Sequence, residues 1–123
     1  MQMVRKTYQD IAEGVRGKLQ ANPRQYPLIR NPDTLKGGCQ NAALMTYQQL
    51  THLGKFPRIF EVSMEIGFHL VVVSGSRIID PTITQYIKDA EKYIYSRNNY
   101  PLNPLILGTE DVTNSPMWGL NPV

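Results

Sequence analysis

Three residues of this chain, Cys39, His69 and Asp80, have side chains that could carry out nucleophilic chemistry together. Cys39 is the only cysteine in 123 residues, and it follows Gly37 and Gly38 directly before a segment with helical spacing. A cysteine attacks as its thiolate, which the unpaired N–H groups and aligned peptide dipoles of a helix start favour. The same N–H groups could stabilise an oxyanion, so the position suits a nucleophile. The alternative is a packing residue, because a lone cysteine is often buried.

A predicted hairpin brings the other two residues together. His69 stands in the apolar run FHLVVV, and Asp80 closes the next run, RIID. With residues 74–75 as a two-residue loop, Asp80 lies directly opposite His69. With residues 75–76 as the loop, Asp80 opposes Val71 and His69 is its diagonal neighbour. Either register puts both side chains on one face, within reach of a hydrogen bond, whereas a three-residue loop would separate them.

An Asp80–His69 pair would complete a catalytic arrangement with the thiol. An aspartate bonded to one ring nitrogen fixes the tautomer and stabilises the imidazolium, which leaves the other nitrogen to take the proton of Cys39. The three residues then act as nucleophile, base and orienting group. Taken singly, His69 could be a core histidine bonded to a carbonyl, and Asp80 could be a turn residue before Pro81.

The remaining histidine and the aromatic residues have less specific interpretations. His52 follows Cys39 by thirteen positions on the predicted helix, a separation of about 20 Å, which is too far for a base. It is expected to complement the helix C-terminus. Tyr86 and Tyr93 are interpreted as core or rim residues, and Trp118 as the cover of a sheet edge or of a substrate cleft.

The spacing of apolar residues predicts three helices, at 4–21, 39–53 and 84–96. The first has an apolar face made of Val4, Tyr8, Ile11, Ala12, Val15 and Leu19. The second begins at Cys39 and ends before a glycine, as helices often do. Residues 22–38 contain several prolines and glycines, which predict an irregular crossing between the first two helices.

Runs of β-branched residues predict the strands. PRIFEV at 57–62 has strand character, FHLVVVSGSRIIDPT at 68–82 predicts a hairpin, and PLILG at 104–108 predicts a last strand. This order of elements predicts an α+β fold, in which a small antiparallel sheet packs on a central helix that starts at Cys39. The length corresponds to one domain over residues 1–123.

Composition and charge exclude several classes of function. The net charge is only +3 and the basic residues are scattered, so a nucleic-acid-binding surface is not expected. One cysteine cannot form an internal disulfide, and one cysteine with two histidines leaves too few ligands for zinc. No metal or cofactor is therefore predicted. No segment has the character of a signal core or a membrane span, which predicts a soluble protein.

The residues around the three candidates resemble a known family. GGCQNAALMTYQQLTHLGKFPRIFEV is similar to the transglutaminase-like branch of the papain-like cysteine superfamily, with its Gly-led Cys, Ala-rich helix, Leu-Gly and Pro-Arg entry into a strand. FHLVVV and IIDPT resemble the family's His-bearing strand and Asp-Pro-Thr ending, and also segments of bacteriocin-processing peptidases. The small size resembles papain-fold toxin domains of secreted bacterial toxins. The match covers roughly residues 36–83.

The resemblance implies a minimal papain-like fold and a single papain-like catalytic domain. It implies Cys39 as nucleophile, His69 as base and Asp80 as orienting group. One departure is Leu70, which stands where the family often has a tryptophan. A partner for the oxyanion hole beyond the backbone N–H of the cysteine is not evident. Residue type alone suggests three candidates for it, Gln20, Gln25 and Asn31.

The implied activity is a thiol enzyme that attacks an amide carbonyl. By analogy we expect a protein-glutamine deamidase that acts as a bacterial toxin or effector domain, because the chain is too small for papain's two lobes. A cysteine peptidase, a transglutaminase, a binding module with a structural cysteine, and a nuclease toxin using His52 and His69 are the alternatives. The expected partners are a protein substrate and an immunity or inhibitor protein. The expected location is the cytoplasm of a target cell, after export within a larger toxin.

Overall fold

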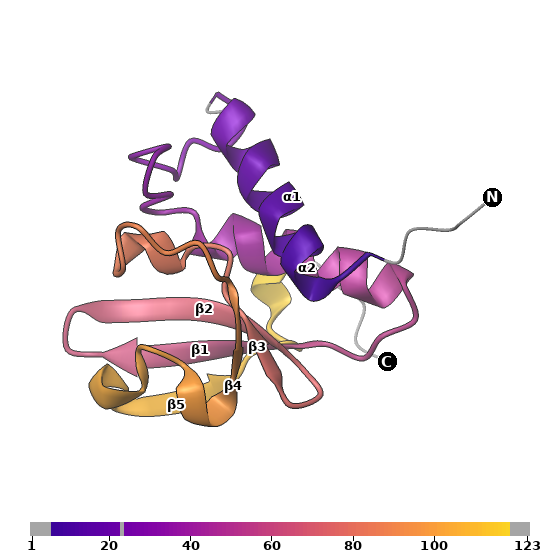
Figure 1. Cartoon of the computed structure of the whole chain (residues 1–123), viewed down its shortest axis with the longest axis vertical. Coiled ribbons are helices and arrows are strands. Elements are labelled where there is room, and N and C mark those ends of the chain that lie inside the picture. Colours follow the sequence, from indigo (N-terminus) through magenta and orange to yellow (C-terminus); the bar gives the residue numbers. More distant parts are fainter. Residues whose placement is uncertain (1–5, 23, 119–123) are drawn as a thin grey trace.

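The computed structural model describes residues 6–22 and 24–118 of the chain. Two helices pack on a small antiparallel sheet of five strands, so the predicted α+β class is confirmed (Figure 1). In chain order the helices and strands are α1 Tyr8–Ala21, α2 Cys39–His52, β1 Arg58–Met64, β2 Gly67–Ser74, β3 Arg77–Ile79, β4 Ile94–Ser96 and β5 Gly108–Asp111.

The first helix ends at Ala21, as predicted, but begins at Tyr8, four residues later than predicted. Thr7 caps it: its hydroxyl accepts from the N–H of Asp10 at 3.1 Å, and the Asp10 carboxylate accepts from the N–H of Thr7 at 2.9 Å. This reciprocal pair satisfies two N–H groups that a helix start otherwise leaves free. The apolar face is buried through Ile11, Ala12, Val15 and Leu19. Val4, which the sequence placed on this face, lies outside the described residues.

The second helix begins at Cys39, as predicted. Its N-cap residue, Gly38, has no side chain to bond the first N–H groups, which therefore stay available. Gly37 has a φ of +88°, and a Cβ added there would lie 2.0 Å from the carbonyl oxygen of Leu28. Only glycine fits this position. The preceding crossing is irregular, as expected, and it folds tightly against the start of α2.

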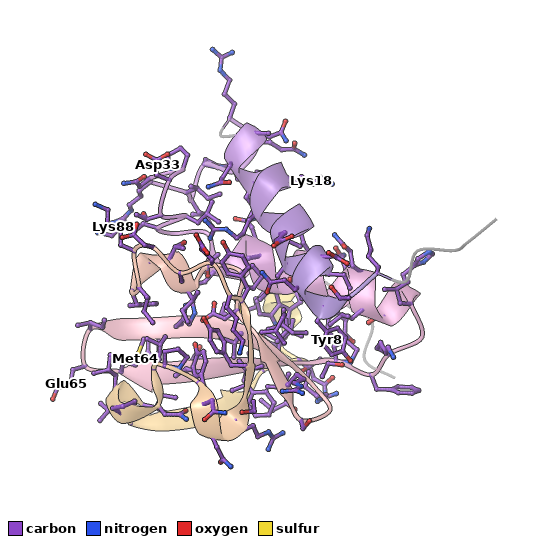
Figure 2. The ribbon with its side chains drawn as sticks, in the orientation of Figure 1. Tyr8, Lys18, Asp33, Met64, Glu65 and Lys88 are labelled. Atoms are coloured by element: carbon purple, nitrogen blue, oxygen red, sulfur yellow. The ribbon has the colours of Figure 1, made fainter. Side chains whose placement is uncertain are left out.

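The sheet has the order β4-β3-β2-β1-β5, and every neighbouring pair is antiparallel. The turn between β1 and β2 contains Glu65 and follows Met64, at one end of the sheet (Figure 2). The turn between β2 and β3 is the two-residue loop 75–76, because Ser74 pairs with Arg77. The structure has the second of the two predicted registers. Val72 pairs with Ile79, so Asp80 comes opposite Val71 and is the diagonal neighbour of His69.

The two faces of the sheet have different neighbours. On one face, the Tyr8 hydroxyl of α1 bonds the Ser74 hydroxyl of β2 at 2.9 Å, so Ser74 and Val72, two positions before it, lie toward the helices. On the other face, Val71 and Val73 lie beside the segment between β4 and β5. In Figure 1 this segment occupies the side of the sheet away from the helices.

Two predicted elements are wrong. No helix forms over 84–96: a short 3₁₀ turn, η1 Ile83–Gln85, is followed by irregular chain and then by β4. Pairing with β3 outweighs the helical spacing, because a strand at this sheet edge gains ladder hydrogen bonds and buries Tyr95. The predicted strand at 104–108 is also misplaced.

The last strand, β5, begins at Gly108, where the predicted one would have ended. The preceding residues form another 3₁₀ turn, η3 Asn103–Leu105, which has a proline in its first positions. Proline has no N–H to donate to a sheet, so pairing starts only beyond it. The first bond to β1 is the one from the Leu107 N–H to the Ser63 carbonyl, at 2.8 Å.

Candidate active site

The hairpin of β2 and β3 brings His69 and Asp80 into direct contact. The His69 Nε2 and Asp80 Oδ2 atoms are 2.8 Å apart, and both side chains are fully buried. Asp80 lies one residue beyond β3 and is held there by the bond from its N–H to the Tyr93 carbonyl, at 2.8 Å. The sequence predicted this pairing from the tight loop alone, and the structure places the two residues together as that argument required.

A third buried residue, Tyr100, completes the cluster. Its hydroxyl donates to the same Asp80 oxygen at 2.6 Å, and 2% of the residue is exposed. Burial, followed by the neighbouring Asp80 charge and bond, raises the pKa of Tyr100 far above its ordinary value. The phenol is therefore a permanent donor that holds the carboxylate in place. Nothing local in the sequence signals this role, because twenty residues separate it from Asp80.

Cys39 lies near the imidazole of His69. It is the first residue of α2 and is partly exposed. The thiol and His69 are not joined by an aligned hydrogen bond, yet they are close enough for the cysteine to affect the histidine's ionisation. The His69 Nδ1 atom is buried and has no aligned partner. It is the ring nitrogen that remains free to exchange a proton with the thiol.

The electrostatics of the cluster favour a charged imidazole. Burial by itself lowers the pKa of His69, because an imidazolium loses its solvation. The charge and hydrogen bond of Asp80 act in the opposite direction, and the nearby Cys39 adds to their effect. The result is a pKa raised from 6.5 to about 9. At neutral pH the histidine is thus an imidazolium, which places a positive charge near Cys39.

Tyr86 forms one wall of this site. Its ring meets the His69 ring edge-on, with centroids 4.9 Å apart and an interplanar angle of 78°. Burial, and then the charges of Cys39 and Asp80, raise its pKa to about 12, so the phenol stays neutral. The residue is half-buried, which makes it the rim aromatic that the sequence allowed. It packs against the imidazole through this edge-on contact.

Gln85 connects the segment after Asp80 to the loop before the cysteine. Its Oε1 atom accepts a hydrogen bond from the Gly37 N–H at 3.2 Å. Its Nε2 atom is buried and has no partner. No local pattern in the sequence marks this residue, since Gly37 and Gln85 are 48 positions apart. The bond fixes the approach of the chain to the start of α2.

The oxyanion candidates chosen by residue type have other contacts. The Gln20 amide donates to the Pro32 carbonyl at 3.1 Å, and the Asn31 side chain accepts from the Asp33 N–H at 2.9 Å. Both therefore stabilise the crossing itself. Gln25 is exposed on the same crossing. The free N–H groups at the start of α2 remain the donors that lie beside the thiol.

Three other predicted residues lie outside the cluster. His52 is exposed in the last turn of α2, at the opposite end from the cysteine. Tyr93 is buried, with the Arg16 guanidinium 4.8 Å from its ring centroid, and it belongs to the core. Trp118 is also buried and donates from its indole to the Val112 carbonyl at 2.7 Å, so it covers the edge near β5 rather than the cysteine.

Comparisons with protein-family models, curated proteins and solved structures gave no match to this chain. Within the described residues, no group of three or more His, Cys, Asp or Glu side chains is arranged to hold a metal ion. In the same part of the chain, no helix has the length and apolar character needed to cross a membrane.

Proposed function

We propose that this protein is a papain-like cysteine hydrolase that deamidates protein glutamine side chains. The observation that carries the proposal is the buried His69–Asp80 pair facing a partly exposed cysteine at a helix start. The three residues supply the nucleophile, the base and the orienting group that thiol catalysis requires. Each comes from a different element, α2, β2 and the end of β3, so the tertiary fold holds them in register.

Cys39 and His69 act in both halves of the proposed reaction, first in forming a thioester and then in hydrolysing it. The Cys39 thiolate attacks the amide carbonyl carbon, and the oxyanion that forms is stabilised by N–H groups at the start of α2. The C–N bond then breaks, and the His69 imidazolium gives its proton to the leaving ammonia. The thioester remains on sulfur. Water, deprotonated by the neutral imidazole, attacks the thioester and releases a carboxylate, and the thiolate and imidazolium are restored.

Asp80 and Tyr100 act through the histidine. The carboxylate holds Nε2, so Nδ1 is the atom that takes and returns the proton. The Tyr100 bond keeps the carboxylate from rotating. Neither group is placed to touch the substrate, because both are buried behind the ring. They are positioning residues.

The same three groups also serve peptide-bond cleavage and acyl transfer to an amine. We favour glutamine deamidation by a bacterial toxin or effector domain because a single small domain supplies fewer subsites than a two-lobed peptidase. The proposed partners are a protein substrate and an inhibitor that covers Cys39 in the producing cell. The proposed place of action is the target-cell cytoplasm, after export within a larger toxin.

A first experiment tests the thiol itself. Iodoacetamide alkylation of the single cysteine would be followed against pH for the unmodified protein, His69→Ala and the matched control His52→Ala. We expect a reactive plateau well below about pH 8.5, where a free thiol ionises. The plateau should be lost in His69→Ala and kept in His52→Ala. A rate that rises only near the free-thiol value in all three proteins would favour the binding module.

A second experiment distinguishes the reactions. The protein would be incubated with casein and with a glutamine dipeptide, and ammonia release, backbone cleavage and incorporation of an added diamine would be measured. Ammonia release without cleavage, absent in Cys39→Ala, supports the deamidase. Cleavage supports a peptidase, and diamine incorporation supports a transglutaminase. Nucleic-acid breakdown that persists in Cys39→Ala would contradict thiol chemistry and favour the nuclease alternative.

A further inference from the structure

A cavity of about 180 Å³ lies on the sheet face away from the helices. Its apolar floor comes from β1, β2 and β3 and includes Val71, Val73 and Ile78. Ile106 and Tyr100 of the segment between β4 and β5 form its wall. Neither Cys39 nor His69 lines this space. It is therefore separate from the place where the thiol would meet its substrate.

The size of the cavity limits what can occupy it. An engineered apolar cavity of about 150 Å³ in another protein takes up benzene, whereas drug-sized ligands need about 300 Å³ or more. A space of 180 Å³ therefore suits an apolar group about as large as a benzene ring or a short alkyl chain. Apolar walls give such a group a favourable transfer from water.

The mouth of the cavity carries a positive charge. Arg97 lines it and is exposed. Among the residues that the structure describes, no carboxylate forms a salt bridge with its guanidinium. Asn103, which also lines the cavity, donates from its side-chain amide to the Arg97 carbonyl at 2.7 Å and holds this backbone in position. A guanidinium that is free to form paired hydrogen bonds favours a carboxylate.

We propose that the cavity is a binding site for a small monocarboxylic acid, whose apolar body lies against Val71 and Val73 and whose carboxylate pairs with Arg97. The charge at the mouth and the apolar floor are complementary to the two halves of such a molecule. This site is independent of the deamidase proposal, because binding needs neither Cys39 nor a reaction.

The cavity is also connected to the candidate active site. The Tyr100 ring forms part of the wall, and its hydroxyl bonds Asp80 at 2.6 Å. Asp80 in turn bonds His69 at 2.8 Å. A bound acid would contact Tyr100, whose hydroxyl holds the Asp80 carboxylate. Occupation of the cavity is therefore expected to change the environment of the His69 ring without contact between ligand and histidine.

The test uses phenylacetate and phenylacetamide, which share a shape and differ in charge. Binding to the full chain would be followed by NMR of the valine and isoleucine methyl groups and of the His69 ring. We expect phenylacetate to shift the methyl signals of Val71, Val73 and Ile78 with a Kd of about 1 mM or lower, which is the affinity expected of a fragment. Phenylacetamide should bind at least about fivefold more weakly.

Two matched variants test whether Arg97 supplies the positive charge that pairs with the ligand carboxylate. Arg97→Gln should remove the preference for phenylacetate over phenylacetamide. Arg77→Gln, an equal charge change at an exposed residue outside the cavity, should retain it. The proposal would be overturned if both compounds bound equally well. It would also be overturned if neither bound at concentrations several times the expected Kd. A Cys39→Ser protein that still binds phenylacetate would show that the site stands even if the catalytic proposal fails.

Discussion

On the sheet side of the candidate site, Asp80 is fully buried and accepts two hydrogen bonds, from Tyr100 at 2.6 Å and from His69 at 2.8 Å. On the helix side, Cys39 is partly exposed and begins a helix whose cap, Gly38, has no side chain to bond the first N–H groups. The imidazole is thus held by a buried carboxylate, while the thiol lies at the open N–H donors of a helix start. A site that must accept a substrate carbonyl needs this asymmetry, because donors satisfied by the protein could not stabilise an oxyanion.

The largest loss of stability is expected from removing one partner of the buried His69–Asp80 pair. Asp80→Ala removes the partner of His69 and leaves a buried imidazole without compensation. We expect the free energy of unfolding to fall by about 3–5 kcal/mol, as for other broken buried pairs. Urea denaturation measures it, with the exposed Asp89→Ala as the matched control. A loss equal to that of the control would mean that the pair contributes nothing to the fold.

A pH titration tests the same pair without mutation. The folded protein binds the His69 proton more tightly than the unfolded chain does, because its pKa is raised from 6.5 to about 9. The stabilisation is complete below pH 6.5 and is lost as the pH rises through about 9. It amounts to about 3 kcal/mol. Denaturation at several pH values, with NMR of the His69 ring, measures both quantities.

The control for this titration is His52→Ala, which should keep the full pH dependence. Cys39→Ser should reduce it, because the cysteine contributes to the raised pKa of His69. A ring that titrates near 6.5 in the unmodified protein would contradict the charged pair.

A single methyl group added at Gly37 is expected to disturb the start of α2, where Cys39 lies. In Gly37→Ala the new Cβ would lie 2.0 Å from the Leu28 carbonyl oxygen, on a residue with a φ of +88°. We expect a loss of about 2–3 kcal/mol and slower alkylation of Cys39, since the start of α2 must move. Gly54→Ala is the matched control, because it has a φ of +80° but no atom within 4 Å of an added Cβ. Equal losses would mean that the close approach to Leu28 is unimportant.

Removing the Tyr100 hydroxyl tests whether Tyr100 positions the Asp80 carboxylate or only packs in the core. Tyr100→Phe keeps the ring in the core and deletes one bond to a buried carboxylate. We expect a loss of about 2 kcal/mol and an altered pH profile of Cys39 alkylation. Tyr26→Phe, which alters a half-buried tyrosine outside the cluster, should change neither. A stability loss with an unchanged pH profile would assign Tyr100 a purely structural role.

The smallest effect is expected from removing the hydrogen bond between Gln85 and Gly37, which joins the segment after Asp80 to the start of α2. Gln85→Ala deletes the bond to the Gly37 N–H, which should cost about 1 kcal/mol. Alkylation of Cys39 should slow more than in Gln48→Ala, an exposed glutamine on α2. An alkylation rate equal to that of the control would mean that the loop keeps its position without this bond.

Local patterns in the sequence predicted much of what surrounds the site. The start of α2 at Cys39, the hairpin of β2 and β3 and the pairing of His69 with Asp80 all follow from features within fifteen residues or so, such as glycines, turn residues and strand periodicity. A two-residue loop leaves few registers, and both of those that the sequence allowed put the histidine and the aspartate on one face. This part of the candidate site was therefore predictable before the fold was known.

Only the tertiary structure decided the rest. Tyr100 and Gln85 enter the site from segments far along the chain, and no local pattern marks the hydrogen bond that each makes. Residues 94–96 form a strand although their neighbours have helical spacing, because the free edge of β3 offers backbone partners. Short-range sequence determines where a helix or a turn begins. Which distant groups meet in the core depends on the packing of the whole chain, and that packing places Tyr100 between the cavity and Asp80.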